Sequence, residues 1–451
     1  MDVYQLYPIY LQHPFISTDT RKITTGSLFF ALKGDKFDAN AFAQKAIETG
    51  AAYAVIDNPD YQLDERYLLV DDVLATLQQL ARHHRDHLKI PVIGLTGTNG
   101  KTTTKELINA VLSQHFKTLA TQGNLNNHIG VPLTILSINP THEMAVIEMG
   151  ANHQKEIESL CLISQPSHGL ITNIGKAHLE GFGGIEGVKK GKGELYDFLA
   201  LPRPEVGVFE GVGVPFINSD DAVLMKMAGE REYCRTIHYG SSNNSINLIS
   251  GEIIENDPLL TLQWTNNKTG ESYKVKTQLT GAYNLHNILA AISIGTFFNL
   301  TAQEINAGIE GYQPKNNRSQ IVQTATNTLI CDYYNANPSS MAVAIENIGK
   351  IEAKRKVLIL GDMFELGDES PAEHASVFQK AMDTPVDERV FIGKDFLSQK
   401  SKVKSQNQDS TRFYETAENA IAGLRTDPIK NSTVLIKGSR GMALERLVEL
   451  F

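Results

Sequence analysis

Short runs of consecutive apolar residues recur along the chain, and each run ends in glycine or a polar residue. Clear examples are residues 91–95, 145–149, 169–174 and 357–360. Runs this short and this apolar are typical of β-strands buried on both faces, as in a parallel sheet. Apolar residues at helical spacing, as in residues 284–299, lie between such runs. The pattern predicts an α/β protein with parallel sheets, whose ligand-facing residues lie where the strands end.

The same pattern divides the chain into three domains, which its length of 451 residues allows. The pattern over residues 1–88 predicts a small α/β domain. Residues 89–313 predict a larger parallel-sheet domain, and the alternation of short strands and turns over 205–280 predicts a β-rich subregion added to it. The polar segment 313–318 indicates a second boundary. Residues 314–451 repeat a strand-then-glycine design that predicts a doubly wound C-terminal domain.

The strand at residues 91–95 leads into a turn and a helix start, where Gly97, Thr98, Asn99 and Gly100 precede Lys101, Thr102 and Thr103. A helix N-terminus after a glycine turn binds phosphate, because unpaired N–H groups and the helix dipole point at one spot. Lys101 adds a charge for the β- and γ-phosphates, and the Thr102 hydroxyl adds a Mg²⁺ ligand. Leu95 replaces the first glycine of the strict P-loop pattern, so a glycine turn without a ligand is the alternative. We expect a P-loop-type ATPase domain.

Two further polar side chains follow neighbouring strands of this domain. Glu148 ends one apolar run, and His178 follows another. An acid at a strand end after a phosphate loop is placed to bind Mg²⁺, and His178 reaches the same sheet edge as Thr102 and Glu148. The alternatives are an acid paired with a lysine and an ordinary polar histidine. Asn284 and Asn287, one helical turn apart, can contact an adenine edge or cap the helix.

Composition excludes several classes of function. The net charge of −9 argues against a broad nucleic-acid surface. No apolar run approaches the roughly 20 residues that span a bilayer, and the N-terminus lacks the pattern of a signal peptide. Cys161, Cys234 and Cys331 are few and scattered, which favours a reducing compartment and argues against a zinc site. We expect a cytoplasmic protein that binds its anionic ligands with local Lys, Arg, Mg²⁺ and helix ends.

Four further runs lie in register with the phosphate loop: GNLNN with GVP at 123–132, EMGAN at 148–152, DYYNANP at 332–338 and GDMFELG at 361–367. With them, the sequence resembles the Mur ligase family of peptidoglycan synthesis over essentially its whole length, most closely the members that add D-alanyl-D-alanine. The resemblance implies a monomeric, ADP-forming ligase that joins UDP-N-acetylmuramoyl-tripeptide to D-alanyl-D-alanine through an acyl phosphate, using ATP and Mg²⁺. It also implies a role in cell-wall synthesis, and hence in cell shape and division.

The resemblance implies roles for single residues as well. The implied catalytic residues are Lys101, Glu148, His178 and Lys192, and two Mg²⁺ ions would be bound by Thr102, Glu148, His178 and a carbamylated Lys192. Composition alone predicts that residues 189–194, around Lys192, form a solvated loop. The implied ATP contacts are Gly97, Thr98, Asn99, Gly100, Lys101, Thr102, Thr103, Asn284, Asn287, Arg318 and Asp332. The implied substrate contacts are Asp19, Thr20, Arg21, Phe30, Asn126, Asn127, Asn335, Asn337, Lys437 and Arg440.

By the same resemblance, residues 1–88 bind the UDP substrate, residues 89–313 bind ATP, and the Rossmann-like residues 314–451 close over ATP and bind the dipeptide. Two alternatives stay open. One is a sister ligase, either another amino-acid-adding member of the family or a folylpolyglutamate synthetase. The other is a nucleotide-dependent switch or an inactive scaffold, which would have no need for the second metal site formed by Lys192, His178 and Glu148.

Overall fold

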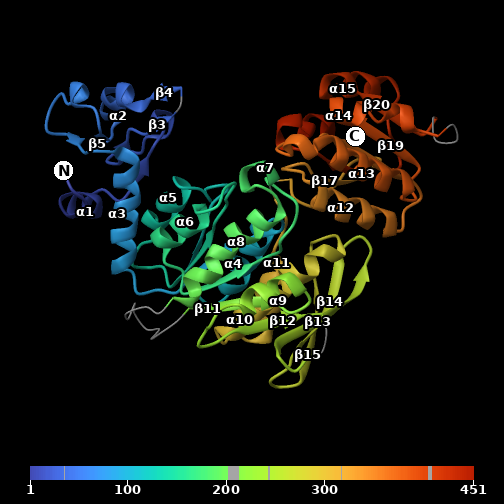
Figure 1. The fold of residues 1–451 in the computed structure, drawn as a ribbon, viewed down its shortest axis with the longest axis horizontal. Helices are drawn as coiled ribbons and strands as arrows, with labels where there is room; N and C mark the ends of the chain where they lie inside the picture. The colour runs from blue at the N-terminus through green and yellow to red at the C-terminus, as the bar shows by residue number, and fades with distance from the viewer. Residues whose placement is uncertain (35, 202–212, 242–243, 316, 405–408) are drawn as a thin grey trace.

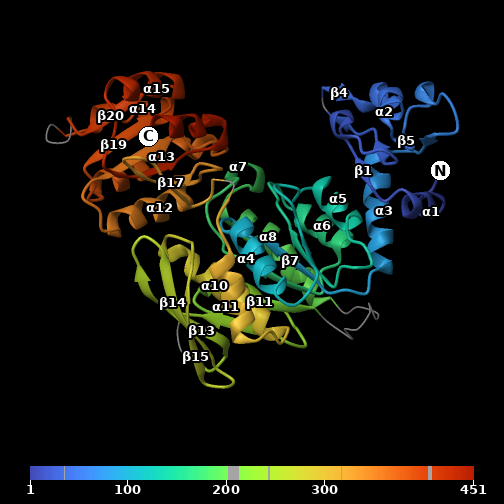
Figure 2. The same cartoon turned by 180° about the vertical axis from the view of Figure 1, so that it is seen from behind.

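The structure is a computed structural model that describes residues 1–34, 36–201, 213–241, 244–315, 317–404 and 409–451. Three sheet-containing blocks follow one another along the chain. The N-terminal and C-terminal blocks lie on opposite sides of the central block, and both views agree on this arrangement (Figures 1 and 2). Among the described residues, every helix is too short or too polar to cross a membrane.

The N-terminal block contains a four-stranded parallel sheet of order β1-β2-β5-β6. Its strands, with the separate β3–β4 hairpin, are β1 Ile16–Ser17, β2 Leu28–Phe30, β3 Lys33–Gly34, β4 Phe37–Asp38, β5 Tyr53–Ile56 and β6 Tyr67–Leu69. Its helices are α1 Val3–Gln12, α2 Ala43–Thr49 and α3 Val73–His87. The long helix α3 also packs against α5 and α6 of the central block, so it joins the two blocks (Figure 1).

The central block contains a nine-stranded sheet of order β15-β14-β13-β12-β11-β10-β7-β9-β8. Strands β7 to β12 pair in parallel, whereas β13, β14 and β15 pair antiparallel with one another and form the β-rich extension. The strands are β7 Val92–Thr96, β8 Thr118–Ala120, β9 Met144–Glu148, β10 His168–Ile171, β11 Val214–Asn218, β12 Ile237–Gly240, β13 Asn247–Asn256, β14 Leu260–Asn266 and β15 Glu271–Lys276. Every residue of β7, β9 and β10 is buried, as the apolar runs predict.

Helices cover both faces of this central sheet. They are α4 Lys101–Leu112, α5 Gly130–Leu136, α6 Glu156–Ser164, α7 Leu179–Phe182, α8 Ile185–Ala200, α9 Ala222–Gly229, α10 Leu285–Phe297 and α11 Ala302–Gly311. One hydrophobic core lies under α5, α6 and α8, and a second lies under α4, α10 and α11. The sheet is therefore sandwiched between helices, and the helix that follows β7 is α4, the predicted phosphate-binding helix.

The structure corrects one sequence prediction in this block. Residues 189–194, predicted as a solvated loop, lie inside helix α8. Their two glycines weaken a helix locally, but here they permit close packing: a Cβ on Gly191 would lie 2.5 Å from the ring of Phe182 in α7. Tertiary packing therefore outweighs the local preference, and it buries Lys192 instead of exposing it.

The C-terminal block contains a six-stranded sheet of order β16-β17-β21-β18-β19-β20, parallel except for the edge strand β16. The strands are β16 Gln320–Gln323, β17 Thr328–Asp332, β18 Lys356–Gly361, β19 Glu388–Ile392, β20 Thr411–Tyr414 and β21 Thr433–Lys437. The helices are α12 Pro338–Lys350, α13 Ser370–Asp383, α14 Lys394–Leu397 and α15 Ala417–Thr426. Hydrophobic cores on both faces of the sheet confirm the doubly wound prediction.

Candidate functional site

A cavity of about 1050 Å³ lies where the central and C-terminal blocks meet. The carboxyl ends of β7, β9 and β10 lead to it, as expected for ligand sites in parallel sheets. Its central-block wall includes residues 98–103, together with Glu148, His178, Asn284 and Asn287. Arg318, Asp332, Tyr334, Asn335, Asn337 and Lys437 add the C-terminal wall. The structure thus brings together most of the predicted nucleotide residues.

The phosphate loop is held in shape by the segment that follows β10. The backbone N–H of Thr98 donates to the carbonyl oxygen of Asn173, and that of Asn99 donates to its side-chain oxygen, both at 3.0 Å. Gly97 has φ +145°, and a Cβ there would collide with the Thr172 hydroxyl, so this position requires glycine. The turn is therefore held in shape by hydrogen bonds within the protein.

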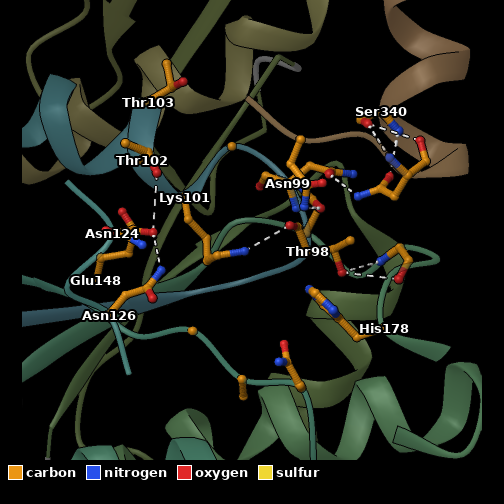
Figure 3. A pocket seen from close by; sticks show the side chains of 18 of the residues that line it. Thr98, Asn99, Lys101, Thr102, Thr103, Asn124, Asn126, Glu148, His178 and Ser340 are labelled. Atoms are coloured by element: carbon orange, nitrogen blue, oxygen red, sulfur yellow. Dashed lines mark hydrogen bonds between the residues drawn. The ribbon is translucent and has the colours of Figure 1, made fainter. Parts of the chain in front are cut away.

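Lys101 lies across this loop and not along the helix surface. Its ammonium donates to the carbonyl oxygen of Gly97 at 2.7 Å. It also donates to the carbonyl oxygen of Thr98 at 2.9 Å, the bond that Figure 3 shows. Burial lowers the pKa of Lys101 to about 8, and the nearby Glu148 carboxylate opposes that shift. The lysine keeps its proton at neutral pH, and it is held by groups that a phosphate can outcompete.

Glu148 supplies the strongest indication of a cation site. Its Oε1 atom accepts hydrogen bonds from the Asn126 amide, at 2.9 Å, and from the Thr102 hydroxyl, at 3.3 Å (Figure 3). Its Oε2 atom is buried and has no hydrogen-bond partner among the described residues. A buried carboxylate oxygen that lacks a partner is costly, and oxygen donors are what Mg²⁺ prefers. The residues at this point therefore fit a Mg²⁺ ion.

His178 and Lys192 lie close to the same wall. His178 is a wall residue, and its Nδ1 atom lies 2.7 Å from Oε2 of Glu365 in the C-terminal block. Burial lowers the pKa of His178, and the Glu365 carboxylate opposes that shift. The Lys192 ammonium lies behind the wall, where it donates to the carbonyl oxygen of Ala151 at 3.0 Å. Burial, together with the smaller effect of the Lys101 charge, lowers the pKa of Lys192 to about 7.

The two predicted adenine residues form one buried network. The Asn287 amide donates to Oδ1 of Asn284 at 2.9 Å, which confirms that they share a helix face. The Asn284 amide donates to the carbonyl oxygen of Thr280 at 2.8 Å, and its side chain makes no capping hydrogen bond to α10. The capping alternative is therefore not what this structure contains, and both amides line the cavity.

The C-terminal wall is made of charged and aromatic groups that contact one another. The guanidinium of Arg318 lies 3.8 Å from the ring centroid of Tyr334, and that of Arg440 lies 5.3 Å from it. Lys437 forms an ion pair with Asp332 at 2.6 Å. The predicted dipeptide residue Asn337 instead donates to Oδ1 of Asn99 in the phosphate loop, at 2.8 Å.

The predicted UDP-substrate residues of the N-terminal block lie apart from the cavity wall. Asp19 and Arg21 form an ion pair at 2.7 Å, in which the Arg21 side chain is 86% exposed. Thr20 begins the short helix Thr20–Lys22, which Asp19 caps and which contains Arg21. Phe30 does not fit its predicted role, because its side chain is fully buried in the hydrophobic core. Two predicted substrate residues, Asn126 and Asn127, do line the cavity, together with Gln78 of α3.

Three residues that shape this site received no individual role from the sequence, namely Asn173, Tyr334 and Glu365. Each belongs to a strand end or to a run quoted above, so their positions in these segments could have indicated a role in the site. Asn173 fixes the phosphate loop, Tyr334 stacks with Arg318, and Glu365 contacts His178. Their partners are distant in the sequence, which is why local patterns did not assign them.

Three side chains in the C-terminal block lie close enough together to be considered as a metal site. Among the described residues, Asp362, His374 and Asp395 place one possible ligand atom each within 4.8 Å of one another. The Asp362 carboxylate already accepts the backbone N–H groups of Asp395 and Phe396, both at 3.0 Å. His374 Nε2 accepts the backbone N–H of Met363 at 3.0 Å. These donors are used to hold the loop and α14 in place, so the group is structural.

Comparisons with known proteins agree with this geometry. Family models match in three consecutive parts: "Mur ligase family, catalytic domain" at residues 13–85, "Mur ligase middle domain" at 95–295, and "Mur ligase, glutamate ligase domain" at 317–440. The UDP-N-acetylmuramoyl-tripeptide--D-alanyl-D-alanine ligase of Escherichia coli (strain K12) is 36% identical over 96% of this chain and 92% of its own length. The ligase of the same name from Bacillus subtilis (strain 168) is 33% identical over the same shares.

Solved structures give the same result. MurF from Acinetobacter baumannii superposes with a TM-score of 0.84 at 30% identity, covering 99% of this chain and 98% of its own. A folylpolyglutamate synthase from Mycobacterium tuberculosis shares only the fold, with a TM-score of 0.61 at 16% identity over 84% of this chain and 94% of its own. The phosphate loop, the buried acid and these matches along the chain lead to one conclusion: the chain belongs to the Mur ligase family.

Proposed function

We propose that this chain joins UDP-N-acetylmuramoyl-tripeptide to D-alanyl-D-alanine and converts ATP to ADP and phosphate. One observation carries the proposal: a phosphate loop and a buried acid with an unpartnered oxygen share a cavity, in a chain that a ligase of that name matches over 96% of its length. A nucleotide switch would have no need for the second metal site that Lys192, His178 and Glu148 would form. The second alternative is a folylpolyglutamate synthetase, and the 16% identity to the folylpolyglutamate synthase argues against it.

The chemistry follows from the poor reactivity of a carboxylate toward an amine. An oxygen of the tripeptide carboxylate attacks the γ-phosphorus of ATP, and the bond to ADP breaks. The dipeptide amine then attacks the carboxyl carbon, inorganic phosphate leaves with its oxygen, and the amine loses one proton. Both steps gather negative charge, so positioning and cation stabilisation provide most of the catalysis. The Lys101 ammonium and the N-terminus of α4 provide that stabilisation from this chain.

The donor set fits Mg²⁺, which would neutralise phosphate and carboxylate charge when bound. Thr102 and Glu148 would hold one ion, and Glu148 and His178 with a carbamylated Lys192 would hold a second. A carbamate requires a neutral amine, and the lowered pKa of the buried Lys192 favours that form near neutral pH. Carbamylation would replace a repelling ammonium with an anionic oxygen ligand.

We assign a role to each domain, with the boundaries predicted from the sequence. Residues 1–88 bind the UDP moiety, residues 89–313 bind ATP, and residues 314–451 close over the nucleotide and bind the dipeptide. Asn335, Lys437 and Arg440 are the proposed dipeptide contacts, because they lie on or beside the C-terminal wall. We place the reaction in the cytoplasm, where ATP and UDP-linked precursors are available, and we propose that the chain acts as a monomer.

The decisive experiment measures phosphate release by the purified protein with ATP and Mg²⁺. The UDP-tripeptide is supplied with lysine or diaminopimelate as its third residue, with and without D-alanyl-D-alanine, and the product is identified by mass spectrometry. We expect release only when both acceptor substrates are present. Release with a single amino acid or a folate acceptor would favour a sister ligase. Nucleotide binding without any release would favour a switch.

A further inference from the structure

The short helix α7 and the residues before it form a contact between the central and C-terminal blocks (Figure 1). The Lys176 ammonium pairs with Glu373 of α13 at 2.6 Å, and the Lys176 backbone N–H donates to the Ser339 hydroxyl at 3.1 Å. Two residues further on, His178 pairs with Glu365 at 2.7 Å. One segment thus makes two separate interdomain contacts, an ion pair and a histidine–carboxylate hydrogen bond, and only the second involves a predicted metal ligand.

The geometry of the second pair is unusual. His178 has φ +52° and Glu365 has φ +62°, conformations that residues other than glycine rarely adopt. Such conformations persist where the surrounding structure imposes them, and they gather at functional sites. The Glu365 side chain is 62% exposed, so the core does not require its carboxylate. What the carboxylate does contact is the His178 ring.

The hydrogen bond decides which ring nitrogen is free. A carboxylate only accepts hydrogen bonds, so Nδ1 of His178 must carry the proton that lies between it and Glu365. In the neutral ring, Nε2 then keeps its lone pair, and Nε2 is therefore the atom that can bind a metal. The ring points into the cavity that Lys101 and Thr98 also reach (Figure 3). Histidine ligands commonly donate their other N–H to a carboxylate, which fixes the ring and strengthens the ligand.

We propose that Glu365 is a positioning residue that orients His178 for Mg²⁺, and that it can do so only while the C-terminal domain is closed. This inference rests on the proposed function, because it takes His178 as a metal ligand. Glu365 belongs to the loop after β18 and His178 to the start of α7, so domain opening separates them. The metal site is then complete only when the domain that covers ATP is in place, which couples closure to the chemistry.

The test compares two carboxylates that contact the same segment. Glu365→Ala removes the partner of His178, Glu365→Gln keeps the size but not the charge, and Glu373→Gln weakens the neighbouring Lys176 pair as a matched control. Mn²⁺ binding to the full chain is measured by electron paramagnetic resonance in the presence of ADP. We expect Mn²⁺ affinity to fall about 10- to 100-fold in Glu365→Ala, with a smaller fall in Glu365→Gln. We expect no change in Glu373→Gln.

A second readout follows the tautomer directly. In protein labelled with ¹⁵N-histidine, the His178 signals, assigned with a His178→Ala variant, should report a proton on Nδ1 in the wild type and in Glu373→Gln. They should shift toward the Nε2–H form in Glu365→Ala. Equal losses of Mn²⁺ affinity in Glu365→Ala and Glu373→Gln would reduce Glu365 to a domain latch and overturn the proposal. Unchanged affinity in Glu365→Ala, or in His178→Ala, would overturn it as well.

The failure of this inference is distinguishable from the failure of the proposed function. If the wild type releases no phosphate with its proposed substrates, the ligase assignment fails. Mn²⁺ affinity and the histidine tautomer do not depend on turnover, so they still decide the role of Glu365. Thermal unfolding of each variant is measured alongside, and the exposure of Glu365 predicts that its loss leaves folding intact.

Discussion

The contact between helices α11 and α4 can be tested with a single methyl group. Gly308 lies in α11 where that helix crosses α4, and a Cβ there would lie 2.6 Å from Cα of Val111 and 2.7 Å from the carbonyl oxygen of Ala110. Ordinary contact begins at 3.4 Å, and both atoms belong to the backbone, so neither can rotate away. In Gly308→Ala the two helices must therefore separate.

The expected magnitude is a balance of two effects. Overpacking costs about 3 kcal/mol at the upper end of its usual range, which applies because backbone has to move. Replacing glycine by alanine inside a helix returns about 1 kcal/mol. We therefore expect Gly308→Ala to lower the free energy of unfolding by about 2 kcal/mol. For a domain of this size that corresponds to a fall of about 4–8 °C in Tm.

The chain provides both the control and the probe. Gly311 is the last residue of the same helix, and a Cβ there meets no atom of the described residues within 4 Å, so Gly311→Ala should be neutral or stabilising by up to about 1 kcal/mol. The single tryptophan, Trp264, is buried in β14 and donates to Asn306 of α11 at 2.9 Å, so its fluorescence follows unfolding beside the mutated helix. If Gly308→Ala unfolded at the same temperature as Gly311→Ala, the close contact between α11 and α4 would be refuted.

Three further outcomes are expected. Lys101→Ala should lower phosphate release at least about 100-fold while binding of the UDP substrate, measured by calorimetry, stays the same; wild-type turnover would refute the role of Lys101. Carbamylation of Lys192 should decline as the pH falls below about 7, since the amine then takes up a proton; ¹³C-bicarbonate labelling should show a carbamate signal that Lys192→Arg lacks. Burial lowers the pKa of His168 to about 3, so the unfolded chain binds more protons below about pH 6.5 and stability should fall with acid. Between pH 7 and pH 5 this proton uptake should lower the free energy of unfolding, measured with urea, by about 2 kcal/mol. His168→Gln should remove that part of the pH dependence.

The sequence predicted the parts of the fold that depend on local pattern. The strands around residues 91–95 and 145–149 were recognisable because residues buried on both faces of a parallel sheet must be apolar over their whole length. The phosphate loop was recognisable because a tight turn before a helix needs glycine, lysine and hydroxyl groups in a fixed order. Thr102 and Glu148 could be paired because parallel strands end at one sheet edge, and their hydrogen bond confirms that proximity.

Other features depend on contacts that local pattern does not encode. Residues 189–194 form part of a helix because Phe182 of α7 packs closely against Gly191, whereas glycine in isolation favours a loop. The edge strand β16 was missed because its residues are only partly buried and lack a clear apolar run. The resemblance implied that Phe30 contacts substrate, but the direction of its side chain depends on packing against the N-terminal sheet, which buries it in the core. Glu365 meets His178 across two domains, so neither residue predicts the other from its own surroundings.

The conformation of the Lys101 side chain limits which molecules can bind to the phosphate loop. Its ammonium already donates to two carbonyl oxygens of the turn, so a ligand must bind the ammonium more strongly than those neutral oxygens do. Adenosine carries no anionic group and would leave the side chain where it is, whereas a chain of phosphates would draw it outward. The turn thereby discriminates between nucleoside and nucleoside triphosphate by charge, independently of any contact with the base.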